Sequence, residues 1–204
     1  MLNVLPREVR AVFTDKTITV YQAYSAPIAD AACRAGTFVA PFKRGRMTWI
    51  KPSFLWMMYR SGWATKPGQE RVLAVEITRE GFEWALAHSC LSHYEPHTFT
   101  SEAEWDQRKH ASPVRVQWDP ERSLTLAPLE NRAIQIGLSG EAVDRYIDGW
   151  IVAIADITTT AHAVAQLVDE GDLEHARLQL PAEAPYPLRA DLAAKIGATR
   201  LRGT

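Results

Sequence analysis

Hydrophobic and polar residues alternate with a period of two in several short stretches of this chain, and that period predicts β-strands. The clearest stretch is 71–78, in which Leu73, Val75 and Ile77 would share one face. β-Branched and aromatic residues, which favour strands, are frequent in these stretches. The predicted strands are 17–24, 47–50, 71–78, 113–118, 132–138 and 150–157.

Segments between these strands have the composition and the end residues of helices. One segment, 28–35, lies between Pro27 and Gly36, which matches the preference for proline in a first turn and glycine just past the last. Ser53 can cap the next segment, 54–61. Further helices are predicted at 80–90, directly after Ser139 or Gly140, at 158–168 and at 189–196.

The 204 residues are enough for one sizeable core, and helices between the early strands predict an α+β fold. We expect a single globular domain over 1–170, with about six strands in a split or mixed sheet and flanking helices. The polar segment 92–112 is predicted to be a long loop or an insertion, and 119–122 a turn or a capped helical turn. The Pro- and Glu-rich residues 171–204 are expected to form a C-terminal arm and a helix that pack on the domain.

Charge is distributed unevenly along a chain whose net charge is −1. Between Lys43 and Arg71 there are seven cations and one acid, Glu70, which leaves a local excess of positive charge. The near-neutral total argues against a protein built as a nucleic-acid coat. A local basic face suits a discrete anionic ligand such as a nucleotide, although it would also fit an ordinary solvated surface.

Composition also bears on location. The sequence contains no run of about 18 apolar residues, and its first residues lack a basic region followed by an apolar one. Cys33 and Cys90 are isolated thiols, too few for a disulfide framework. These features predict a reduced, cytoplasmic setting without a membrane partner, and no particular oligomeric state.

Several common catalytic motifs are missing from the sequence. It has no Gly-x-Ser-x-Gly elbow, no Gly-x-Gly-x-x-Gly and no Walker-type loop, so neither a serine hydrolase nor a Rossmann or P-loop nucleotide site is predicted. His88, His93 and His97 have possible ligand spacings, but neither Cys nor a His-Glu-x-x-His pattern accompanies them. No metal is therefore expected.

Polar side chains embedded in apolar strands are the best candidates for a ligand site. Because side chains alternate between the two faces of a strand, each of them lies either on a solvent face or in a cleft. Taken singly, each is expected on a solvent face, but together with nearby tyrosines and cations they favour a cleft. The strand residues are Gln22, Thr48, Gln117 and Gln135, and the nearby residues are Tyr21, Tyr24, Arg46, Lys51 and Arg60.

Five blocks of the sequence carry a family resemblance. The longest reads Arg-Met-Thr-Trp-Ile-Lys-Pro-Ser-Phe-Leu-Trp-Met-Met-Tyr-Arg-Ser-Gly, and the five blocks are 7–11, 18–24, 46–62, 114–122 and 132–138. With these blocks the chain resembles, to about Thr159, the family known as domain of unknown function 4291. That resemblance brings no established activity with it.

The order of the polar residues is also similar to the ADP-ribosyltransferase fold. There, a first strand ends in an aromatic–polar pair, a second strand carries Ser, Thr or Tyr before a helix, and a later strand carries a catalytic Glu or sometimes Gln. Tyr21 with Gln22, then Thr48, then Gln135 hold those places here. The chain departs from the pattern because Gln22 replaces His or Arg, no Gly follows it, and there is no Glu-x-Glu pair.

This second resemblance implies an ADP-ribosyltransferase-like protein that binds NAD or a related nucleotide and transfers ADP-ribose to an acceptor. It implies catalytic roles for Gln22, Thr48 and Gln135, and the residues it places at the cofactor are Tyr21, Tyr24, Arg46, Lys51, Ser53 and Arg60. A neutral Gln cannot stabilise an oxocarbenium ion as a carboxylate does. Glu76 or Asp119 would have to supply that charge, the acceptor would have to be strongly nucleophilic, or the fold would bind a nucleotide without turning it over.

Two other interpretations stay open. In the first, the chain is a nucleic-acid-binding or RNA-modifying module that uses the basic and aromatic face 43–71 without NAD chemistry. Its basic residues would follow the phosphates of a nucleic acid, as ligand or acceptor, while Trp49, Trp56 or Trp63 stacks on bases. In the second, the aromatic block belongs to the core. Trp56 and Tyr59, three residues apart, would then share one buried helix face.

Overall fold

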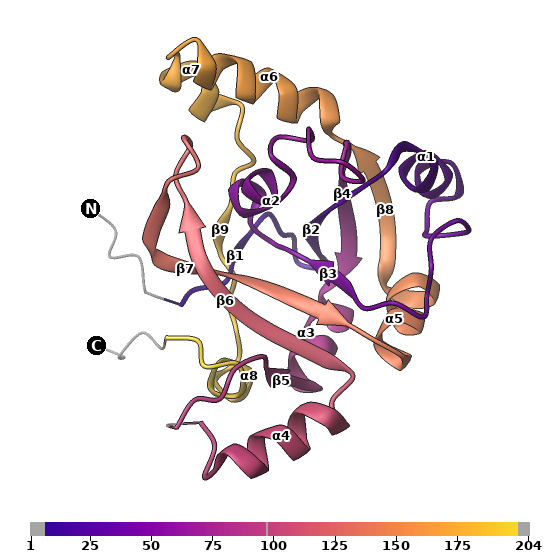
Figure 1. The fold of residues 1–204 in the computed structure, drawn as a ribbon, viewed down its shortest axis with the longest axis vertical. Helices are drawn as coiled ribbons and strands as arrows, with labels where there is room; N and C mark the ends of the chain where they lie inside the picture. Colours follow the sequence, from indigo (N-terminus) through magenta and orange to yellow (C-terminus); the bar gives the residue numbers. More distant parts are fainter. Residues whose placement is uncertain (1–6, 97, 200–204) are drawn as a thin grey trace.

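The computed structural model describes residues 7–96 and 98–199, and within them two larger sheets, one two-stranded pair and their helices form an α+β domain (Figure 1). The first sheet contains, in order, β2 (Thr17–Tyr24), β4 (Arg71–Thr78) and β8 (Ile151–Asp156), all antiparallel. The second contains, in order, β3 (Thr48–Ile50), β7 (Pro128–Leu138), β6 (Val114–Arg122) and β5 (Ser89–Leu91), of which only β5 and β6 run parallel. The predicted fold class is confirmed.

The two sheets are joined by one bridge between Tyr21 in β2 and Lys51 directly after β3. The Tyr21 amide donates to the Lys51 carbonyl over 2.7 Å, and the Lys51 amide donates back over 3.2 Å. Pro52 follows and has no N–H group, so it cannot extend the pairing. In the described part of the chain this bridge is the whole of the pairing between β2 and β3, so the two sheets fork beside it.

Helices cover and link the sheets. α2 (Phe54–Ser61) contacts both β2 and β6, so it lies where the two sheets meet, whereas α1 (Ala26–Ala35) lies beside β4 and β8 (Figure 1). The remaining helices are α3 (Arg79–Ala87), α4 (Glu102–Ala111), α5 (Glu141–Arg145), the π-helical turn η1 (Tyr146–Trp150), α6 (Thr158–Asp169), α7 (Leu173–Leu178) and α8 (Ala190–Lys195).

The predicted start and end of α2 are confirmed. The Ser53 hydroxyl accepts a hydrogen bond from the Trp56 amide over 3.2 Å, which satisfies one of the free donors at the helix start. Gly62 ends the helix with φ of 59°, a left-handed conformation that suits glycine. Local sequence therefore determines where α2, the helix after the junction of the two sheets, begins and ends.

The structure differs from the sequence prediction in four details. The helix predicted at 80–90 ends at Ala87, and β5 follows it. The segment 92–112 contains α4, whose Ser101 cap and oppositely charged ends stabilise a helix that has no buried side chain. Residues 119–122 continue β6, because an irregularity in the register near Pro120 accommodates the proline. The described residues hold nine strands, not about six, because the sequence did not predict β1, β5 and β9, each of which is only two or three residues long.

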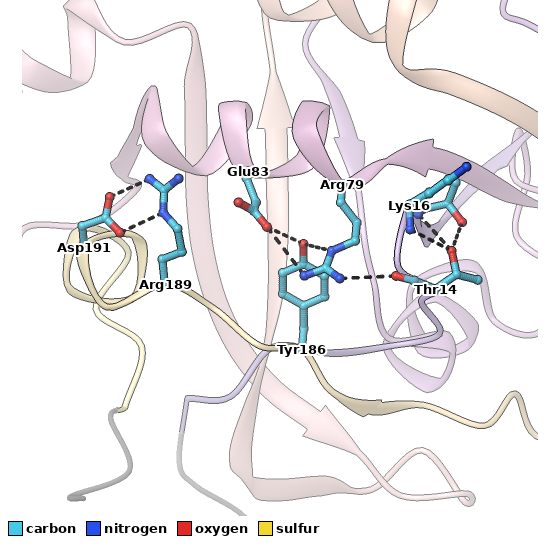
Figure 2. A network of polar contacts seen from close by, with 8 residues as sticks. Thr14, Lys16, Arg79, Glu83, Tyr186, Arg189 and Asp191 are labelled. Atoms are coloured by element: carbon cyan, nitrogen blue, oxygen red, sulfur yellow. Dashed lines mark hydrogen bonds and ion pairs between the residues drawn. The ribbon is translucent and has the colours of Figure 1, made fainter.

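The C-terminal arm is tied into the domain. Its strand β9 (Ala184–Pro185) pairs with β1 (Arg10–Ala11), and the next residue, Tyr186, is buried. Figure 2 shows Tyr186 between two side chains of α3: its hydroxyl donates to Glu83 over 2.8 Å and accepts from Arg79 over 2.9 Å. The Arg79 guanidinium also lies 4.8 Å from the Tyr186 ring centre. The arm is thereby fixed against the same core as α3.

The arm also supplies a carboxyl group to the start of α2. Glu183 accepts from the Phe54 amide over 2.7 Å, and nearby Glu121 accepts from the Ser53 hydroxyl over 2.9 Å. Burial raises the pKa of Glu183 to about 8, the Phe54 hydrogen bond opposes this, and the charge of Glu121 adds to it. Burial also raises the pKa of Glu121. Two carboxyl groups thus share one poorly solvated place beside the helix start.

Replacing Glu183 with Gln keeps an acceptor for the Phe54 amide and removes the titrating proton. Because the pKa rises from 4.5 to about 8 on folding, wild-type stability falls as the pH rises through that window. We expect Glu183→Gln to match the wild type near the lower value and to exceed it by roughly 1–3 kcal/mol at about pH 8.5, by urea unfolding. The exposed Glu130→Gln variant is the control, and a pH-independent difference for Glu183→Gln would contradict the assignment.

Candidate functional site

A cleft of about 420 Å³ lies in the fork between the two sheets. Its polar lining comes from four strands or strand ends that are far apart in sequence. β2 contributes Gln22 and Tyr24, β3 and the residue after it contribute Thr48 and Lys51, and β6 and β7 contribute Gln117 and Gln135. The three residues predicted as catalytic, Gln22, Thr48 and Gln135, therefore line one cleft.

Gln22 is the centre of a buried hydrogen-bond network on one wall of this cleft. The Gln22 amide nitrogen donates to the Thr48 hydroxyl over 2.6 Å and to the Tyr24 hydroxyl over 2.8 Å, and these two hydroxyls lie 2.7 Å apart. The Tyr146 hydroxyl donates to the Gln22 carbonyl oxygen over 2.7 Å. Gln22 is only 2% exposed, so partners on both ends of its amide fix its orientation.

The two phenols in this network stay protonated near neutral pH. Burial raises the pKa of Tyr24 to about 12, although its hydrogen bond with Thr48 opposes the rise. Burial also raises the pKa of Tyr146 well above its usual value. Tyr146 is the first residue of η1, and π-helical turns are common at functional sites. Both phenols act here as hydrogen-bonding groups and not as bases.

Asp119 holds the glutamines on the opposite wall. Gln117 and Gln135 are cross-strand partners, and their amide nitrogens donate to the two oxygens of Asp119 over 2.9 and 2.6 Å. A carboxylate only accepts hydrogen bonds, so both NH₂ groups must face Asp119. The two carbonyl oxygens have no partner among the described residues, which leaves them able to accept hydrogen bonds from a ligand.

Lys51 is a buried amine without a counter-ion. It is 5% exposed, and its Nζ donates to the Trp49 carbonyl over a long 3.4 Å. No carboxylate among the residues described lies within ion-pair distance of it. Burial lowers its pKa to about 7, the charge of Arg60 lowers it further, and Asp119 opposes the change. An amine kept at such cost to stability is typical of a functional site.

Two exposed arginines stand near the cleft without an ion-pair partner among the described residues. Arg60, on α2, lines the cleft itself. Arg46 lines a neighbouring hollow of about 360 Å³ that shares Tyr24 and Thr48 with the cleft. By contrast, Arg44 of the same basic segment is paired with Asp144 and Asp148. Arg46 and Arg60 are thus available to an anionic ligand, as is the exposed Lys43, which lines the same hollow as Arg46.

Two predicted cofactor-binding residues lie outside the cleft. Tyr21 is 2% exposed, and its ring packs edge-on against Phe54 at 5.6 Å on the face of β2 opposite Gln22. Ser53 caps α2 and donates to Glu121. These two residues hold the walls of the cleft in place through packing and capping.

Sequence reasoning left out two residues that matter at the site. Tyr146 approaches Gln22 across 124 residues of chain, and its place in a short helix gives no local sign of that contact. Gln69, which also lines the cleft, belongs to the turn before β4. Glu76 and Asp119 were considered as replacements for the missing Glu. The Glu76 carboxylate accepts a hydrogen bond from the Thr17 hydroxyl, across the paired strands β2 and β4.

Metal ligation and membrane crossing have no structural support in the described ranges. Within 7–96 and 98–199 no three His, Cys, Asp or Glu side chains gather where they could hold a metal ion. His88 instead stacks on Trp84 with ring centres 3.9 Å apart, and His97 lies outside the described residues. In the same ranges no helix has the length and apolar character needed to cross a bilayer.

A family model described as Domain of unknown function (DUF4291) matches residues 8–186. The match extends beyond the point near Thr159 reached by the sequence blocks, and it includes both sheets and the β1–β9 pair. The resemblance to this family is therefore confirmed, whereas the likeness to the ADP-ribosyltransferase fold stays a prediction. No curated protein matches the chain.

The Tyr146–Gln22 hydrogen bond can be tested by removing one hydroxyl. Tyr146→Phe leaves the buried Gln22 carbonyl oxygen without its donor, so we expect a loss of roughly 1–3 kcal/mol of unfolding free energy. Tyr59→Phe is the matched control, since the Tyr59 ring is partly exposed and its hydroxyl makes no hydrogen bond among the described residues. Equal losses in both variants, by urea unfolding, would contradict the network.

The uncompensated burial of Lys51 predicts a variant that is more stable than the wild type. Lys51→Met should raise the unfolding free energy by roughly 2–5 kcal/mol at about pH 6, where the folded and unfolded wild-type amines are both protonated. The folded amine loses its proton near pH 7 and the unfolded amine near pH 10.5, so wild-type stability rises between these values and the advantage shrinks. The exposed Lys43→Met variant is the control, and a destabilised Lys51→Met would contradict the assignment.

Proposed function

This chain belongs to the family described as Domain of unknown function (DUF4291), and we propose that its cleft binds NAD or a related nucleotide and transfers ADP-ribose to an acceptor. One observation carries the proposal. Gln22, Thr48 and Gln135 come from three distant parts of the chain, and they line one cleft in the fork between two sheets. Their order along strand, strand–helix and later strand resembles that of the ADP-ribosyltransferase fold.

Charge and hydrogen-bonding capacity near the cleft suit the parts of such a ligand. Arg60 and Arg46 would bind the pyrophosphate, because guanidinium groups form paired hydrogen bonds with phosphate oxygens. The free carbonyl oxygens of Gln117 and Gln135 would accept hydrogen bonds from ribose hydroxyls or from a carboxamide NH₂. Tyr24 lies at the boundary of the cleft and the neighbouring hollow, where a planar ring could rest against it.

The arrangement also addresses the missing catalytic glutamate. Breaking the bond between nicotinamide and ribose develops positive charge on the ribose, which negative potential stabilises. Asp119 orients the amide dipoles of Gln117 and Gln135 so that their negative ends are free on the side away from the carboxylate. We therefore assign Asp119 the role of positioning these two amides, in place of a carboxylate that touches the ribose.

The nucleic-acid alternative is less well supported by the aromatic residues. Trp56 is 6% exposed and stacks on Tyr59, and Trp63 packs edge-on against Phe54. Trp49 lies over Gly137, where an added Cβ would come within 3.0 Å of its ring. Base stacking on Trp56 would therefore require its displacement, whereas Trp49 and Trp63 each pack on one neighbour within the fold and are partly exposed.

Isothermal titration with ADP-ribose and with NAD tests the proposal. We expect saturable heat with both ligands, and affinity at least about tenfold weaker in Gln135→Ala, the loss expected for roughly 1.4 kcal/mol of hydrogen bonding. The control is Gln179→Ala, because Gln179 is an exposed residue at the end of α7.

Two results would contradict the proposal. One is the absence of heat with ADP-ribose, NAD and nicotinamide alike. The other is tight binding of an oligonucleotide that weakens steeply between low and moderate salt while the mononucleotides do not bind, which would favour the nucleic-acid alternative.

A further inference from the structure

We propose that Lys51 is the proton-accepting side chain of the cleft, which takes the proton of the acceptor's hydroxyl or amine group as that group attacks the ribose. This inference rests on the proposed transferase function and adds a catalytic residue to it. Lys51 lies at the vertex of the fork, where its backbone pairs with β2 and its side chain lines the cleft.

The other titratable groups that line the cleft are unsuited to this role. Arg60 stays protonated across the physiological range. Tyr24 is a phenol that donates and accepts hydrogen bonds, and burial keeps its proton in place. The remaining polar lining residues, Gln22, Thr48 and the three other glutamines, do not accept protons in this range. Among the cleft-lining residues, Lys51 is thus the group with a usable lone pair.

The surroundings of Lys51 favour its neutral form. Arg60 approaches from α2 and disfavours a second positive charge, whereas Asp119 on β6 favours it. Asp119 is already engaged by the two glutamines, and Tyr24 on β2 is neutral. Burial adds to the effect of Arg60, and it lowers the pKa of Lys51 to about 7. A base with a pKa near the working pH is the most effective kind for general-base catalysis.

The step balances as a nucleophilic displacement. The bond between the ribose carbon and the nicotinamide nitrogen breaks, and its electron pair leaves with nicotinamide, which thereby becomes neutral. The acceptor oxygen or nitrogen forms the new bond to the same carbon. Its proton passes to the Lys51 amine, which becomes an ammonium ion and later releases the proton to solvent. The class of acceptor is a hydroxyl or an amine, with water as the simplest case.

The first measurement needs no nucleotide. Trace labelling of the wild-type protein with acetic anhydride across the pH range from about 5 to about 10, read by peptide mass spectrometry, reports the neutral fraction of each lysine amine. We expect half-maximal labelling of Lys51 near pH 7 in the folded protein. In the same protein unfolded in urea, labelling of Lys51 should reach no plateau by about pH 10, because the ordinary pKa of this amine is 10.5. The same labelling curve for Lys51 in the folded and the unfolded protein would overturn the inference whether or not NAD binds.

The second measurement follows nicotinamide release from NAD with water as the acceptor. We expect the wild-type rate to rise with pH to a plateau above about pH 7, and Lys51→Ala to lose the pH dependence with at least about a hundredfold lower rate. Added methylamine should restore activity to Lys51→Ala but should not affect Gln179→Ala, a result that a merely structural lysine would not give.

The possible outcomes distinguish a failure of the proposed role of Lys51 from a failure of the proposed nucleotide binding. A Lys51→Ala rate equal to that of the wild type, or NAD bound without nicotinamide release at any pH, would overturn the role of Lys51 and leave nucleotide binding in place. Failure of both NAD and ADP-ribose to bind would instead overturn the proposed function. Retained binding of ADP-ribose by Lys51→Ala shows that the variant is folded, and Lys51→Met serves as the second variant if it is not.

Discussion

The Tyr21–Lys51 bridge is the interaction on which the rest of the structure depends. Two backbone hydrogen bonds join the sheets at this point, and the following proline stops the pairing. A sheet that continued through β2 and β3 would bring their backbones to about 4.8 Å and leave no room for a ligand. Because the strands fork, side chains of both can face a common space while the sheets remain attached.

The fork buries polar side chains, and the fold satisfies their hydrogen bonds to different degrees. The Gln22 amide nitrogen donates to the Thr48 hydroxyl, and the Gln22 carbonyl oxygen accepts a hydrogen bond from Tyr146 of η1. Lys51, in contrast, has one long hydrogen bond and no carboxylate partner in the described residues. A satisfied hydrogen-bond network thus lies beside a buried amine that lacks a counter-ion among the described residues, and such amines are frequent at functional sites. The C-terminal arm contributes to that rigidity, since Glu183 holds the start of α2.

The alternation of polar and apolar residues and the capping residues at helix ends predicted much of the fold and of the site. The strand periods, the Ser53 cap and the polar residues within apolar strands were readable because each depends on neighbours in sequence. Strand alternation also separates Tyr21 from Gln22, so only one of the two could face the cleft. The helix α4 was missed because it has no buried face, although its cap and its charged ends were present.

Other features depend on contacts that no local pattern contains. The hydrogen bond from Tyr146 to Gln22, the one from Gln135 to Asp119 and the pairing of β9 with β1 all join residues that are well separated in sequence. The state of Lys51 follows from its burial and from Arg60, neither of which its own sequence neighbours indicate. Sequence therefore predicted which residues are polar within the strands, and the fold decides which of them meet.

The most direct test of this account is a crystal structure of the protein with ADP-ribose bound. The account predicts the ligand in the fork between β2 and β3, with its pyrophosphate near Arg60 and its terminal ribose against Gln135 and the Gln22–Thr48 pair. Ligand bound at another surface, while this cleft stays open and empty, would contradict it.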